Sequence, residues 1–273
     1  GADELRLWEM EALDQINGPQ SLIGEIARFQ RADTPERFEK LLARLAAYPG
    51  WIAAHQANVA AGVASGRTAP SPVVERCIAQ TRGLLETPAE KSPLMAGHPE
   101  LPEAQHDRLL DAIREHVEPA LASWLATLED YAGHARAGDG VCHLPDGDAV
   151  YRHHILSYTN LPEDPQVIHD YGLRRLDEIE AAEASIAAEL GHESVAALRV
   201  FLDRDAENHA DTPEEMVALA EQWVRRAEVE APKWFGDPPE ERCRVKKVEG
   251  HAEQSAPAGF YYPPADDGSR PGT

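Results

Sequence analysis

Residues 109–131 read LLDAIREHVEPALASWLATLEDY, and their apolar positions recur every three or four residues. That spacing places the apolar side chains on one side of an α-helix, which has about 3.6 residues per turn. The stripe consists of Leu110, Ile113, Val117, Leu121, Trp124, Leu128 and Tyr131. It predicts a long amphipathic helix over roughly residues 102–136, with Trp124 in the core. Because the stripe continues past Pro119, we expect this proline to kink the helix rather than end it.

Outside this stretch, a capping residue followed by proline marks the start of several further helices. These pairs are Thr34–Pro35, Ser71–Pro72, Asp164–Pro165 and Thr212–Pro213. Proline suits the first helical position, because the N–H that it lacks would have no partner there. Glu215 is placed to complete a capping box with Thr212, and Gly191 is a typical residue to end the helix that begins at Pro165.

Segments rich in glycine and proline are expected to separate these helices. The predicted breaks are residues 48–50, 66–72, 87–102 and 135–148. No fixed repeat period is present, which argues against a helical solenoid. Residues 1–236 are therefore predicted to form a helical domain.

After residue 236 the pattern changes to short β-type runs bounded by glycine and proline. The runs are residues 241–250 (ERCRVKKVEG) and 258–264 (AGFYYPP), and they predict two short strands. Residues 237–273 are thus expected to hold short strands and a turn. The predicted fold class is mainly α, an elongated multi-helix bundle with a small β element at the C-terminal end.

The charge balance excludes some classes of partner. The chain has 273 residues, with 26 Lys and Arg against 48 Asp and Glu, which gives a formal net charge of −22. Phosphates would be repelled along most approaches, so nucleic acid is not an expected partner. Such an excess of acid favours cationic ligands or simply keeps a protein in solution.

Features that report on the cellular compartment are few. The apolar runs are too short for a membrane span, which needs about 20 residues, and the charged start GADELRLWEM does not resemble a signal peptide. Cys77, Cys142 and Cys243 are far apart and odd in number, which predicts free thiols and favours a cytoplasmic location.

Twelve histidines and many carboxylates raise the question of a metal site. A zincin helix carries two histidines one turn apart in the pattern H-E-x-x-H. His192–Glu193 and His251 lack the second histidine, and no histidine in the sequence lies four residues from another. The sequence therefore predicts no zinc site in this chain.

The stretch YRHHILSYTN, residues 151–160, is the most polar and aromatic of the predicted helices. His153 and His154 point about 100° apart on a helix, so they do not share one metal ion. Two interpretations stay open: ordinary packing, or one histidine lining a cleft together with Tyr158 or Thr159. His169 lies between apolar neighbours and is expected to be a packed histidine.

Three segments follow one another in the chain with specific motifs. They are GRTAPSPVVERCIAQ (66–80), LPDGDAVYRHHILSYTNLPEDPQVIHDYGLRRLDEIEAAEASIAAELG (144–191) and SAPAGFYYPPADDGSRPGT (255–273). The second contains Leu-Pro-x-Gly-x-x-x-Tyr and Pro-x-x-Ile-His-x-x-Gly-Leu, and the third contains Asp-Gly-Ser-Arg-Pro-Gly. From about residue 20 to residue 273, the chain resembles the bacterial family catalogued as domain of unknown function 885.

That resemblance implies a predominantly helical protein related to gluzincin-type zinc metallopeptidases. The family's zinc motif, His-Glu-Ala-x-Pro-Gly-His, follows the Ser-Arg-Pro-Gly turn and is absent from this sequence, which stops at Thr273. The resemblance thus implies an N-terminal portion with no metal ligand and no cofactor of its own, and zinc in the full-length family member. Since the true N-terminus is then also absent, the resemblance leaves export and lipidation open.

The resemblance also implies that the last segment borders the substrate cleft. Its candidate cleft residues are Tyr261, Tyr262, Ser269 and Arg270. A tyrosine there could donate a hydrogen bond to a developing oxyanion. Adjacent tyrosines on an extended segment point to opposite faces, so at least one of the two is expected to pack.

Two functions follow from the sequence and the resemblance. The first is the N-terminal helical fragment of a zinc metallopeptidase-like protein, which forms one wall of a peptide-binding cleft and is inactive alone. Its partner would be the missing C-terminal catalytic half, or a second copy through self-association. The alternative is an autonomous acidic helical module that binds cationic peptides or a partner protein without catalysis.

Overall fold

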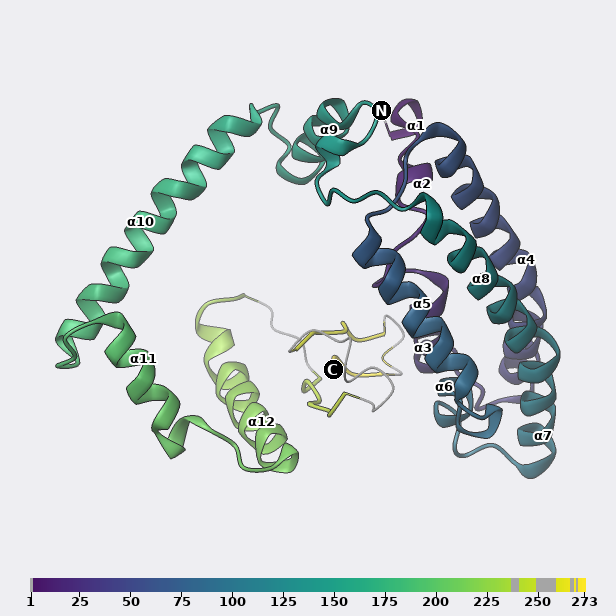
Figure 1. The fold of residues 1–273 in the computed structure, drawn as a ribbon. Coiled ribbons are helices and arrows are strands. Elements are labelled where there is room, and N and C mark those ends of the chain that lie inside the picture. Colours follow the sequence, from purple (N-terminus) through teal and green to yellow (C-terminus); the bar gives the residue numbers. More distant parts are fainter. Residues whose placement is uncertain (1, 237–240, 249–258, 266–267, 269) are drawn as a thin grey trace. The chain divides into compact units, whose positions relative to one another are not determined.

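The computed structural model describes residues 2–236, 241–248, 259–265, 268 and 270–273. These residues are mainly α-helical, as the sequence predicts, and the chain divides into two compact units, Gly1–His169 and Asp170–Thr273 (Figure 1). The sequence pattern changes near residue 236, and the helical structure ends close to that point. Among the described residues, the last helical turn ends at Lys233.

The first unit is a bundle of helices. Its α-helices are α1 (Ala2–Leu5), α2 (Leu7–Met10), α3 (Pro19–Phe29), α4 (Pro35–Ser65), α5 (Ser71–Glu86), α6 (Pro93–Ala96), α7 (Glu103–Ala112), α8 (Glu118–Tyr131) and α9 (Gly147–Thr159). Short 3₁₀ turns lie at Ala89–Lys91, Ala132–His134 and Val141–His143, and a π turn spans Ile113–Val117. The helix α5 packs along α8, and α4 packs against both α8 and the π turn (Figure 1).

The predicted long amphipathic helix is confirmed as a continuous helical segment from Glu103 to His134. It consists of α7, the π turn, α8 and a final 3₁₀ turn. In the π turn, the Glu118 N–H donates to the carbonyl of Ile113, five residues earlier. This irregularity lies immediately before Pro119, whose ring cannot donate to an ordinary helical hydrogen bond.

The core of the first unit is built from α4 and the Glu103–Tyr131 segment. Its largest fully buried side chains include Phe38, Leu41, Leu45, Ile52, Leu109, Ile113, Trp124 and Leu128. Trp124 has no exposed surface, and its indole Nε1–H donates to Gln20 Oε1 at 3.2 Å. The burial predicted for Trp124 is therefore confirmed.

The predicted helix break at residues 48–50 is wrong. The helix α4 continues through Tyr48, Pro49 and Gly50. Tyr48 is buried, and its hydroxyl donates to the carbonyl of Pro19 at 3.2 Å. Because buried side chains on both sides of Pro49 keep this face against the core, packing outweighs the hydrogen bond that the proline removes.

The predicted helix caps at two threonines are confirmed. Thr34 Oγ1 accepts from the Arg37 N–H, and Thr212 Oγ1 accepts from the Glu215 N–H, both at 3.2 Å. Glu215 in turn accepts from the N–H of Asp211, at 2.8 Å, rather than from Thr212 itself. The reciprocal bond of a capping box thus reaches one residue further back.

The second unit contains most of α10 (Pro165–Glu189), then α11 (Val195–Arg204) and α12 (Pro213–Glu230). Gly191 follows α10 with φ of +82°, a left-handed conformation that favours glycine. Among the described residues of this unit, only Ala187 and Leu198 are buried apolar side chains. His169, expected to be packed, is instead exposed on α10, so that expectation is wrong.

The predicted β element is wrong for the part of residues 237–273 that the structure describes, since no strand forms there. Residues 249–258, which include the ends of both predicted strands, lie outside the described residues. Isolated backbone pairs do form: Tyr262 and Thr273 exchange both N–H···O bonds, at 2.8 and 2.9 Å. Proline at 263, 264 and 271 lacks the N–H needed to extend this pair into a ladder.

None of the described helices combines the length and the apolar character that a membrane crossing needs. The three cysteines are free thiols, as expected. Burial raises the pKa of the Cys77 thiol to about 12, so this side chain behaves as a small apolar core residue.

Candidate functional site

The second unit contains a pocket of about 510 Å³, which we call the C-terminal pocket. It lies between the end of α12 and the last residues of the chain. Its lining residues are Arg225, Glu228, Val229, Ala231, Pro232, Glu241, Arg242, Cys243, Tyr261, Pro264 and Gly272. Apolar walls with a few charged and hydroxyl groups are typical of a small-ligand or peptide subsite.

Hydrogen bonds from α12 hold the floor of the C-terminal pocket. The Cys243 N–H donates to Glu228 Oε1 at 2.8 Å, and Arg225 donates to the Cys243 carbonyl. Arg225 and Glu228 also form an ion pair with each other. The next residue, Arg244, donates its N–H to the Gly272 carbonyl at 2.8 Å, so α12, residues 243–244 and the end of the chain form one connected structure.

The two adjacent tyrosines have different surroundings. Tyr262 packs edge-on against Phe260, with ring centroids 5.2 Å apart. Tyr261 lines the C-terminal pocket and lies over Gly272, where an added Cβ would come within 2.5 Å of the tyrosine hydroxyl. Glycine at position 272 therefore permits the close approach of Tyr261. Of the two, Tyr261 is the one that presents a polar group to a pocket.

Of the other two predicted cleft residues of this segment, Arg270 does not line the pocket. The Arg270 carbonyl accepts from the Ala265 N–H at 2.9 Å, and its guanidinium donates to the Pro271 carbonyl at 3.5 Å. Arg270 thus closes the turn that returns the chain toward Tyr262. Ser269 lies outside the described residues.

The predicted histidine pair belongs to α9 in the first unit. His154 Nε2 lies 3.8 Å from Glu11 Oε1, and its ring stacks on Tyr158 with centroids 6.0 Å apart. His153 lies beside His154, with centroids 6.0 Å apart, and both histidines are partly buried. Tyr158 is 84% exposed. These three side chains form a polar aromatic surface on α9 and line neither of the two pockets described in this section.

A buried ionic cluster, which the sequence did not predict, fixes the start of α9. The Glu9 side chain is fully buried and accepts from Arg67 at 3.0 Å and from Ser65 at 2.8 Å. It also pairs with Arg6, while Arg67 reaches Asp146 at 3.1 Å, immediately before α9. Arg6 and Asp146 have φ of +50° and +57°, a strained conformation for residues other than glycine. Since Glu9 and Arg67 are 58 residues apart, no local sequence pattern could have revealed the pair.

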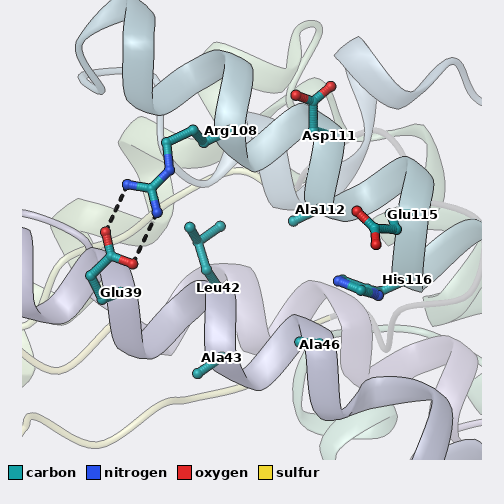
Figure 2. A pocket seen from close by; sticks show the side chains of 9 residues that line it. All are labelled: Glu39, Leu42, Ala43, Ala46, Arg108, Asp111, Ala112, Glu115 and His116. Carbon is teal, nitrogen blue, oxygen red and sulfur yellow. Dashed lines mark hydrogen bonds and ion pairs between the residues drawn. The ribbon is translucent and has the colours of Figure 1, made fainter.

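A second groove lies in the first unit between α4 and the α7–π turn segment (Figure 2). It has a volume of about 430 Å³ and is lined by Glu39, Leu42, Ala43, Ala46, Arg108, Asp111, Ala112, Glu115 and His116. The Arg108 guanidinium donates two hydrogen bonds to the Glu39 carboxylate, at 2.7 and 3.0 Å. These bonds lower the pKa of the Glu39 carboxyl group. The floor is apolar and includes Leu42, Ala46 and Ala112. The carboxylates of Asp111 and Glu115 belong to the α7–π turn side.

The described residues do not fit the zinc ion that the resemblance implies. Nowhere in the described parts of the chain do three His, Cys, Asp or Glu side chains come together in a group that could hold a metal ion. Structural zinc sites use four ligands and catalytic sites usually three, so the donor set is incomplete here.

Its helical architecture defines the chain as a mainly α protein of two compact units. A family model described as "Bacterial protein of unknown function (DUF885)" matches residues 1–273, and the chain belongs to this family. No curated protein matches the chain.

The chain also has the fold of part of a solved structure, described as "the putative lipoprotein from Colwellia psychrerythraea". The TM-score is 0.84 at 23% sequence identity, and the match covers 95% of this chain. It covers 48% of the Colwellia chain, so this chain spans about half the length of that protein.

Proposed function

We propose that this chain is the N-terminal helical part of a zinc metallopeptidase-like protein and forms one wall of a peptide-binding cleft. The observation that carries the proposal is the C-terminal pocket, which Tyr261 lines together with the apolar residues Val229, Pro232 and Pro264. An apolar surface with a few oriented hydrogen-bond donors suits a peptide, whose main chain offers carbonyl oxygens at regular intervals.

The donors of the pocket lie on two different segments. Arg242 contributes a guanidinium from residues 241–243, and Tyr261 contributes a phenol from the end of the chain. Both can donate to a peptide carbonyl or carboxylate, and neither can serve as a zinc ligand in the way that histidine does. These two side chains are therefore suited to hold a substrate.

The rest of the peptidase machinery would belong to a second portion of the protein. This chain spans about half of the Colwellia protein, and those of its residues that the structure describes do not provide a zinc site. In our proposal the zinc ligands and the general base lie in that second portion, and the chain of residues 1–273 has no peptidase activity alone.

The first experiment compares two proteins: the chain of residues 1–273, and the protein continued along its own reading frame beyond Thr273. The longer protein should bind about one zinc ion and hydrolyse peptides, because it would supply the missing ligands. The shorter chain should do neither. Tight stoichiometric zinc in the shorter chain, or a longer protein with neither zinc nor peptidase activity, would contradict the proposal.

The second experiment tests the role of the pocket as a cleft wall. In the longer protein, Tyr261→Phe should raise KM roughly fivefold, because one substrate hydrogen bond contributes about 1 kcal/mol. Tyr151→Phe on α9, a half-exposed tyrosine outside the pocket, is the matched control and should leave KM unchanged. Equal effects of the two substitutions would remove the pocket from the proposed cleft.

The alternative function, an acidic binding module, is supported by the groove in Figure 2. Its apolar floor and the carboxylates of Asp111 and Glu115 suit the aliphatic stem and charged end of a lysine side chain. The chain alone would then bind a lysine-rich peptide, and binding would weaken with salt. Loss of that binding in Asp111→Asn with Glu115→Gln, together with a longer protein lacking peptidase activity, would favour this alternative over the proposal.

A further inference from the structure

The helices of the second unit carry apolar side chains that its own described residues leave exposed. On α10 and just past its end, the exposed residues Tyr171, Ile179, Ile186 and Leu190 fall within about 100° around the helix axis, given about 100° of rotation per residue. These four form a stripe, while the exposed Leu176 and Leu173 of the same helix lie outside it, at about 140° and 200° from Tyr171. A stripe of this kind is the side of an amphipathic helix that normally faces a core.

The helix α12 shows the same pattern. Met216, Leu219 and Trp223 are exposed at positions i, i+3 and i+7, which lie on one side of the helix. Trp223 is 56% exposed, although tryptophan is a residue that usually finds cover in the interior of a protein. We define the stripes on α10 and α12 together as the apolar surface of the second unit.

The first unit does not need this surface in order to fold. Nearly all of the buried apolar residues in the described parts of the chain belong to the first unit, and they form a continuous core around α4, α5 and α8. Within the second unit, the three helices make few contacts with one another. The described residues of the second unit therefore leave its apolar surface without cover.

We propose that the apolar surface of the second unit is the docking site for the second portion of the same protein. This inference rests on the proposed function and names the surface through which the two portions join. The Colwellia chain shares the fold of this chain over 95% of the present chain's length. Slightly more than half of the Colwellia chain lies outside the shared region. An apolar surface left open within the shared half is a natural place for the additional half to pack.

A second copy of the chain is a less suitable occupant. Each copy carries a formal charge of −22, so two copies repel each other as they approach. The helix α10 itself carries more acidic than basic residues, with Asp177, Glu178 and Glu180 against Arg174 and Arg175 in its middle turns. A partner that covers this helix would favour an apolar face with basic residues at its edge.

The test measures solvent access to individual side chains by hydroxyl-radical footprinting with mass spectrometry. The chain of residues 1–273 is compared with the protein continued along its own reading frame. In the longer protein, oxidation of Met216 and Trp223 should fall roughly fivefold or more, because an interface core excludes water. Tyr158 on α9 is 84% exposed and serves as the internal control, with an oxidation rate that should stay within about twofold.

A pair of matched variants ties any protection to the apolar surface. Leu219 on α12 and Leu156 on α9 are 43% and 47% exposed. In the longer protein, Leu219→Asp should abolish the protection of Met216 and Trp223, because a buried unpaired charge opposes docking. Leu156→Asp should leave the protection intact.

Three results would overturn this inference. They are unchanged oxidation of Met216 and Trp223 in the longer protein, a reading frame that ends at Thr273, and protection that appears in the shorter chain as its concentration rises. The last result would assign the surface to a second copy. Protection without zinc or peptidase activity would instead uphold the docking surface and contradict the proposed function, so the two failures are distinguishable.

Discussion

Two tryptophans show how differently the two units of this chain are built. Trp124, in the first unit, has no exposed surface and donates a hydrogen bond to Gln20. Trp223, in the second unit, is 56% exposed on an apolar stripe. The first unit closes its own core, whereas the second unit is folded locally into helices whose apolar sides lack cover in the described structure. A helix can form from its own sequence signals, but a core requires a partner surface.

The largest expected difference between the two units is the effect of replacing each of these tryptophans by alanine. Trp124→Ala should lower the free energy of unfolding of the first unit by about 3–5 kcal/mol, because it leaves a large cavity in a packed core. Trp223→Ala in the same chain should change it by less than about 0.5 kcal/mol. Urea unfolding followed by circular dichroism measures both. Similar losses for the two variants would mean that the second unit is packed in solution.

The next effect concerns ion pairs in the two units. Glu9→Gln should destabilise the first unit by about 3 kcal/mol, because Arg67 would lose its buried partner and keep only the exposed Asp146. Arg199→Gln removes the exposed pair with Glu183 in the second unit and should cost less than about 1 kcal/mol. The same unfolding measurement applies. If Glu9→Gln were as mild as Arg199→Gln, the Glu9 cluster would not hold the first unit together.

Two histidines, the buried His98 and the partly buried His55, give the first unit a pH dependence. Burial lowers the pKa of His55 and of His98 below the ordinary value of 6.5, because desolvation penalises the charged ring. As pH falls below 6.5 the unfolded chain takes up protons that the native rings resist. This contribution to stability is therefore complete above about pH 6.5 and is lost as pH falls through that value toward the lowered pKa values.

The corresponding measurement is urea unfolding of the first unit at about pH 7.5 and about pH 5.5, a range that stays above the titration of most carboxyl groups. The variant with both His55→Gln and His98→Gln should lose less stability between the two pH values than the unsubstituted chain. His169→Gln, an exposed histidine on α10, is the control and should behave like the unsubstituted chain. An undiminished pH dependence in the double variant would contradict the assignment to these two rings.

The sequence predicted those parts of the fold that depend on local signals. The stripe from Leu110 to Tyr131 and the caps at Thr34 and Thr212 are confirmed, because periodicity and capping act within a few residues. The break expected at Tyr48–Gly50 was wrong, because the contact of Tyr48 with Pro19 acts across 29 residues. The expected strands were wrong in the described residues, because prolines stop the single backbone pair at Tyr262 from extending into a ladder.

The roles predicted for the cleft residues stay predictions, but the structure shows where two of them lie. The sequence and the family resemblance pointed to Tyr261, which the structure places in the C-terminal pocket, and to Arg270, which the structure places in a turn. They did not point to Arg225 or Glu228, because these side chains reach the pocket only through contacts with Cys243, 15 to 18 residues away. The Figure 2 groove was missed for the same reason, since it joins Glu39 to Arg108 across 69 residues.

The most direct test of the contrast between the two units is native-state hydrogen exchange on the chain of residues 1–273, measured at dilution that keeps it monomeric. Amides of α4, α5 and α8 should exchange only through global unfolding of the first unit, because their helices surround a closed core. Amides of α10, α11 and α12 should exchange much faster, through local opening of helices without cover. Protection of α10–α12 equal to that of α8 in the monomeric chain would contradict the contrast, and with it the need for a partner on the apolar surface of the second unit.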